Sequence, residues 1–139
     1  MLSAITSALP SDASAIASAG FPQGESAIDG GGLDSAAFLS LHLLVLGGEL
    51  DEVLPAYDPV AKGSDEGPWV FVIPSLLRHH LASLSNSAVL GLAQEWSECQ
   101  ELEDDGVEAE EAAEILAGFS SVARMANSSG KELLLWLSL

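Results

Sequence analysis

Residues 67–74 read Gly-Pro-Trp-Val-Phe-Val-Ile-Pro and lead directly into Ser75-Leu76-Leu77-Arg78-His79-His80-Leu81. Because Trp69–Ile73 are all β-branched or aromatic and lie between prolines, they predict a short buried strand. Pro74 lacks a backbone N–H and has a fixed φ, which suits the start of a helix. The stretch therefore predicts a strand that passes directly into a helix, and the rest of the chain must pack around this pair.

The end of the chain supplies the natural pairing partner for this strand. Lys131–Leu139 is apolar on both faces, so its periodicity does not distinguish a strand from a helix. The segment is short, follows Gly130 and resembles the first strand in composition, which favours a strand over Leu133–Leu137. The fold class predicted is α+β, mostly α: a nearly all-helical domain whose minimal two-stranded element pairs Trp69–Ile73 with Leu133–Leu137.

Helical spacing of apolar residues predicts the other elements. Asp34 is placed to cap a helix that runs to about Leu46, where two glycines end it. Further helices are expected from Ser85 to about Leu102 and from residue 109 to between 127 and 130. In these two helices the side chains expected to face the core are Leu92, Trp96, Ile115 and Phe119.

The domain organisation follows from a shift in composition near residue 32. Residues 1–32 are rich in Ser, Ala and Gly and end in Gly30-Gly31-Gly32, which predicts a flexible arm. Residues 33–139 carry the apolar periodicity and predict a single compact, acidic helical domain.

The charge balance limits the classes of partner. The chain has 139 residues, 21 acidic against 4 basic, and a formal net charge of −17. Such a chain repels phosphate backbones and anionic membranes, so neither nucleic acid nor membrane is expected as a partner. The longest apolar runs fall short of a membrane span, and the single cysteine, Cys99, indicates a reducing compartment. We therefore expect a cytoplasmic protein without a cofactor.

Three features of the second half carry a resemblance to a known family. They are Trp69-Val70-Phe71 before Pro74, Trp96 followed by Glu101-Leu102, and the ending from Gly130-Lys131 through Leu135-Trp136-Leu137-Ser138-Leu139. On these features the chain from Gly67 onward resembles a family of small, uncharacterised bacterial proteins. The resemblance implies a small helical fold with little sheet, and it implies no catalytic or binding residue.

The strongest functional signal is an acidic belt, the ten carboxylates from Glu95 to Glu114 among which no lysine or arginine occurs. A surface of one sign steers an oppositely charged partner and can mimic a phosphate backbone. The leading hypothesis is therefore a non-enzymatic interaction module, of inhibitor or immunity type, that binds a basic protein. The residues predicted to contact the partner are Glu95, Glu98, Glu101, Asp104, Asp105, Glu108 and Glu111.

Two other hypotheses remain open. One is a metal-dependent hydrolase that combines belt carboxylates with His79. Glu101, Glu103 and Asp105 are its weak metal candidates, since they fit the first positions of an EF-hand loop, but Ala112 stands where a bidentate Glu is needed. The other is that the charge is an adaptation to high salt and serves no ligand.

The remaining chemically active side chains are predicted to be structural. His80 lies on the apolar stripe of its helix, and His42 lies within a helix that is apolar all round. Carboxylates surround Cys99 and should raise the pKa of its thiol, which disfavours a nucleophile. No residue is predicted to be catalytic.

Overall fold

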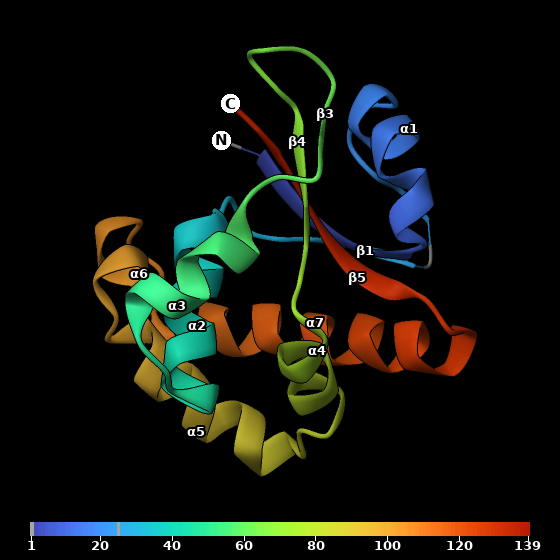
Figure 1. Ribbon diagram of the computed structural model, residues 1–139. Coiled ribbons are helices and arrows are strands. Elements are labelled where there is room, and N and C mark those ends of the chain that lie inside the picture. The colour runs from blue at the N-terminus through green and yellow to red at the C-terminus, as the bar shows by residue number, and fades with distance from the viewer. Residues whose placement is uncertain (1, 25) are drawn as a thin grey trace.

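The computed structural model describes residues 2–24 and 26–139 of the chain (Figure 1). The strands are β1 (Leu2–Ala8), β2 (Ala27–Asp29), β3 (Ala61–Lys62), β4 (Trp69–Val72) and β5 (Glu132–Ser138). The α-helices are α1 (Ala13–Ser18), α2 (Ser35–Leu46), α3 (Leu50–Val53), α4 (Ser75–Ala82), α5 (Asn86–Ser97), α6 (Gln100–Asp104) and α7 (Ala109–Ser129). Short 3₁₀ turns cover Pro10–Asp12 and Leu54–Tyr57.

The strands form a single antiparallel sheet that is larger than expected. In the described part of the chain, five strands lie in the order β2-β1-β5-β4-β3. The expected pair is present, since β4 lies beside β5 with Phe71 opposite Leu135. The prediction of a minimal two-stranded element in a nearly all-helical domain is nevertheless wrong, because β5 has a second, longer neighbour in β1.

That neighbour comes from the segment expected to be a flexible arm. β1 pairs with β5 along its whole length, from Leu2 opposite Ser138 to Ala8 opposite Glu132, and β2 then pairs with β1. Ala4 and Ile5 are completely buried. The described residues of this segment, 2–24 and 26–32, thus supply an interior strand and an edge strand instead of a loosely held arm.

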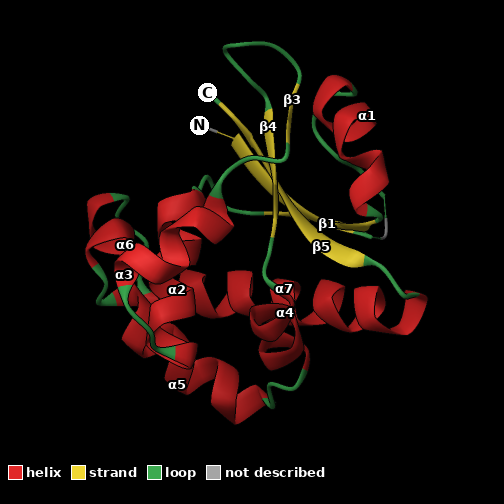
Figure 2. Ribbon diagram, in the orientation of Figure 1, coloured by secondary structure: helices red, strands yellow, loops and turns green. Residues whose placement is uncertain are grey.

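Both faces of the sheet are covered, which explains why β5 is apolar on both sides. Leu133, Leu135 and Leu137 pack with the large helical core, whereas Leu134 and Trp136 pack with the small α1 side chains Ala13 and Ala17. Figure 2 shows α1 on one side of the sheet and the other helices on the opposite side. A strand buried on both faces reads as a continuous apolar run rather than an alternating one.

The helical layer is held together by an aromatic cluster. The ring centroids of Phe38 and Phe119 are 4.8 Å apart, and Trp96 lies against both. The indole N–H of Trp96 donates to the carbonyl oxygen of Ala37 at 3.1 Å, so this buried donor is satisfied. Trp96, Phe119 and Ile115 are buried as expected, and Leu92 is half-buried against the same core.

The long helix α7 joins the two layers. It contacts α4 and α5 on one side and β1, β2 and β5 on the other. It ends at Gly130, whose φ of 65° lies in the left-handed region that glycine adopts without strain. None of the helices in the described residues is long and apolar enough to cross a membrane.

Candidate functional site

The acidic belt lies at one end of the helical layer, where α5 ends, α6 crosses and α7 begins (Figure 1). Of the seven residues predicted to bind a partner, only Glu101 is half-buried. The other six are exposed: Glu95, Glu98, Asp104, Asp105, Glu108 and Glu111. The fold therefore gathers these carboxylates on the surface and does not enclose them around a cavity.

A break in the helix arranges the belt differently from the sequence expectation. The helix predicted to run to about Leu102 ends at Ser97, and a second helix begins after Cys99, whose backbone is extended. In a continuous helix, Leu102 would lie roughly 240° around the axis from the core-facing Trp96. The break turns Leu102 inward, where it is completely buried.

The break also changes the electrostatic setting of the belt. Glu101 and Glu103 occupy the first turn of α6, and Glu110 and Glu111 the first turn of α7. Negative charge is favourable at a helix N-terminus, because the backbone N–H groups there are unpaired. A helix running to about Leu102, as the sequence predicts, would place Glu101 at an unfavourable C-terminus, and the break places it at an N-terminus instead.

The belt carboxylates have no cationic partner within the described residues. The two ion pairs found there join Lys62 to Asp65 and Arg78 to Glu132, and both lie outside the belt. Among residues 2–24 and 26–139, the belt carboxylates accept side-chain hydrogen bonds only from amides: Gln94 donates to Glu98 at 3.3 Å and Gln100 donates to Asp104 at 2.7 Å. The acidic charge at this end of the molecule is therefore uncompensated.

The weak metal candidates do not converge. Glu101 and Glu103 lie on α6, so they belong to a helix and not to the open loop that an EF-hand requires. Glu103 and Asp105 are exposed. Over residues 2–24 and 26–139, no group of three or more His, Cys, Asp or Glu side chains is arranged to hold a metal ion.

The structure does not bring His79 together with the belt. His79 is exposed on α4 and has the guanidinium of Arg78 as its polar neighbour, with Nη2 3.4 Å from Nε2. Arg78, and not His80, is the buried polar residue of this helix, while His80 is half-buried. The hydrolase hypothesis thus gains no geometric support.

The other two candidate side chains have structural surroundings. Nδ1 of His42 lies 3.0 Å from the hydroxyl oxygen of Tyr57, and burial lowers the pKa of His42. Burial, together with the carboxylates of Glu101, Glu103 and Glu98, raises the pKa of the Cys99 thiol. A thiol held protonated is a poor nucleophile, in agreement with the sequence expectation.

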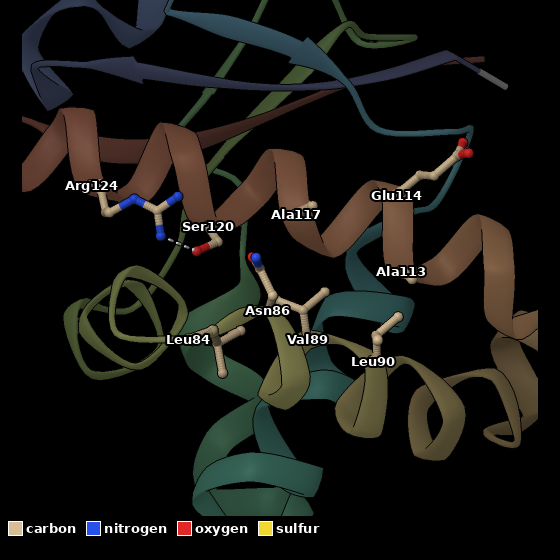
Figure 3. Close-up of a pocket in the computed structure, with 9 residues that line it drawn as sticks. All are labelled: Leu84, Asn86, Val89, Leu90, Ala113, Glu114, Ala117, Ser120 and Arg124. Atoms are coloured by element: carbon tan, nitrogen blue, oxygen red, sulfur yellow. Dashed lines mark hydrogen bonds between the residues drawn. The ribbon is translucent and has the colours of Figure 1, made fainter.

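A groove between α5 and α7 was not expected from the sequence. It has a volume of about 330 Å³ and lies beside the belt (Figure 3). The apolar spacing predicts one buried face for α5 and one for α7. A groove between these two helices depends on how they pack against each other, which the spacing does not predict. The one available signal was Leu90, an apolar residue on the outer face of α5 that is 64% exposed. The lining residues are Leu84, Asn86, Val89, Leu90, Ala113, Glu114, Ala117, Ser120 and Arg124.

Comparison with known proteins gives no match to a family model, a curated protein or a solved structure. The geometry and charge of the surface are therefore the basis for assigning a function to this chain.

Proposed function

We propose that this chain is a non-enzymatic acidic module that binds a basic protein partner through the acidic belt. The observation that carries the proposal is that six of the seven predicted contact residues are exposed and that none has a cationic partner in the described part of the chain. Each such carboxylate is solvated and available to pair with a lysine or arginine from another molecule. Ion pairs across an interface contribute mainly to partner choice and association rate.

An inhibitor or immunity-type role against a cationic toxin or nuclease would use both properties. A dense acidic surface attracts such a partner over distances of about 10 Å at moderate salt and occupies the surface that would otherwise bind phosphate. We further propose a reducing, cytoplasmic compartment for this chain, because its single cysteine, Cys99, is free.

The test compares two variants with equal changes in net charge. The belt variant carries Glu98→Lys, Glu101→Lys, Glu108→Lys and Glu111→Lys. The control variant carries four reversals at exposed acids outside the belt, at Asp12, Asp58, Asp65 and Glu66. Wild type and both variants serve as immobilised bait, and the proteins that each retains are identified by mass spectrometry. Each basic protein retained is then titrated against all three chains to measure its affinity.

The belt variant should lose at least tenfold in affinity for the partner, whereas the control variant should bind nearly as wild type does. Equal loss in both variants would show that net charge alone is responsible, as expected if the acids are an adaptation to salt. Retention of no basic protein, or unchanged binding by the belt variant, would remove the proposal. Thermal unfolding of all three chains establishes that each is folded.

A further inference from the structure

We propose that the groove between α5 and α7 is the binding site for an amphipathic helix of the basic partner. The inference rests on the proposed function. In it, the belt is the charged part of the interface with the partner and the groove is the apolar part. In this binding mode the apolar face of a helix enters a hydrophobic groove, and its charged residues remain along the rim.

The walls of the groove are suited to apolar side chains. Val89 and Leu90 of α5 form one wall, and Ala113 and Ala117 of α7 form the other (Figure 3). The volume of about 330 Å³ exceeds the roughly 150 Å³ of an apolar cavity that binds benzene. Leu90, 64% exposed at the lip, would be covered by an occupant.

One end of the groove leads toward the acidic belt. On α7, Glu110 lies three residues before Ala113 and therefore on the same helix face. On α5, Gln94 lies four residues after Leu90, and its amide donates to Glu98. Cationic side chains of an occupant would meet belt carboxylates there. Glu114 itself points away from the groove in Figure 3.

The other end of the groove is positively charged. Arg124 lies there, and its Nη1 donates to the buried hydroxyl of Ser120 at 2.7 Å, which fixes the guanidinium beside the groove (Figure 3). A helix carries partial positive charge at its N-terminus and partial negative charge at its C-terminus. The occupant should therefore lie with its N-terminus toward the belt and its C-terminus toward Arg124.

The distance between the two ends sets the length of the occupant. From Ala113 to Arg124 the α7 axis rises about 16 Å at 1.5 Å per residue, or about three helical turns. Two labelled peptides of about 14 residues, identical in composition, serve as probes. Both form a leucine face, but one carries its lysines in the N-terminal half and the other in the C-terminal half.

Fluorescence anisotropy should show tighter binding of the peptide whose lysines are N-terminal, by about fivefold or more, which is on the order of 1 kcal/mol. Leu90→Ser, which removes the apolar lip, and Ala117→Phe, which fills the groove, should each weaken binding about tenfold. Leu76→Ser is the matched control, since Leu76 is 69% exposed on α4 and does not line the groove. It should bind as wild type does.

The outcomes separate the groove from the belt. If the groove variants bind the peptides as wild type does while the belt variant does not, the groove inference is overturned and the belt proposal stands. If the two peptides bind equally, the proposed orientation is overturned. If the wild type binds neither peptide, the groove is not a seat for a basic helix, whereas the belt proposal is still decided by the bait experiment.

Discussion

At the scale of single residues, the most consequential side chain is Arg78. It is 8% exposed, and from α4 it donates to Glu132 of β5 and to Asn127 of α7, with Nε 2.9 Å from Oδ1. A buried guanidinium requires such partners, because an unpaired charge in the interior is costly. Arg78 therefore joins both layers of the fold at one point.

This arrangement predicts strong coupling between Arg78 and Glu132. Arg78→Met and Glu132→Met should each cost about 1.5–3 kcal/mol of stability, because each leaves the other group without its charged partner. The double substitution should cost about 1 kcal/mol less than the sum of the two. Urea unfolding of the four chains measures the cycle, and strictly additive costs would show that the pair does not act as a unit.

The pair formed by His42 and Tyr57 predicts a pH dependence. Burial lowers the pKa of His42 in the fold, so the unfolded chain binds a proton more readily. The stability that comes from keeping His42 neutral is complete above the pKa of the unfolded chain, about 6.5. It is lost as the pH falls through the lowered pKa of His42 in the folded chain.

His42→Gln provides the comparison, since its amide oxygen can still accept from Tyr57 but does not titrate. Wild type should lose stability relative to this variant as the pH falls below about 6.5. Urea midpoints measured between about pH 7.5 and 5.5 test this expectation. Parallel curves for the two chains would show that His42 does not contribute.

The sequence placed these polar residues less well than the apolar ones. A helical stripe identifies Leu77 and Leu81 as buried, and both are. The same stripe placed His80 in the core and made no prediction for Arg78, a residue type that is almost always exposed unless it is paired. The pairing depends on Glu132, which is 54 residues away, and no local pattern reveals it.

At the scale of elements, α2 begins where the capping rule places it. The side chain of Asp34 accepts a hydrogen bond from the backbone N–H of Ala37 at 3.1 Å. Asp34→Ala should therefore be less stable than Asp34→Asn by about 1 kcal/mol, since both remove the charge but only Asn keeps the cap. Thermal unfolding of the two variants makes the comparison, and equal stability would show that the cap contributes nothing.

Two other elements show where local patterns fail. The break between α5 and α6 allows Leu102 to be buried, and the need for this appears only once α2 packs against α6. β1 consists largely of small residues that have little strand propensity. It becomes a strand because β5 offers it a seven-residue antiparallel edge.

At the scale of the whole molecule, the sequence predicted which helix faces are buried better than it predicted how distant elements pair. The acidic charge can be read from the composition. The helical spacing of Trp96 and Phe119 predicts which helix faces are buried, and the belt carboxylates lie mainly on the other faces. The groove did not follow, because it is formed by two helices whose relative position depends on the rest of the core. The five-stranded sheet was missed for a similar reason, since the pairing of β1 with β5 joins opposite ends of the chain.

The uncompensated charge predicts stabilisation by salt. Within α7, Glu114 lies four residues after Glu110 and three after Glu111, and each like-charged neighbour costs about 0.2–0.5 kcal/mol in dilute solution. Raising NaCl or KCl from about 0.05 to 1 M shortens the screening length from above 10 Å to about 3 Å. The unfolding midpoint in urea should therefore rise, by about 1 kcal/mol of stability and equally for both salts.

The belt variant isolates the source of this effect. Because its reversals place lysines among the remaining acids, its stability should depend less on salt than that of the control variant, which keeps the belt intact. Equal salt dependence in the two variants would assign the repulsion to the whole surface. The belt would then hold no special concentration of unfavourable charge for a basic partner to relieve, and its proposed role in binding would lose its electrostatic basis.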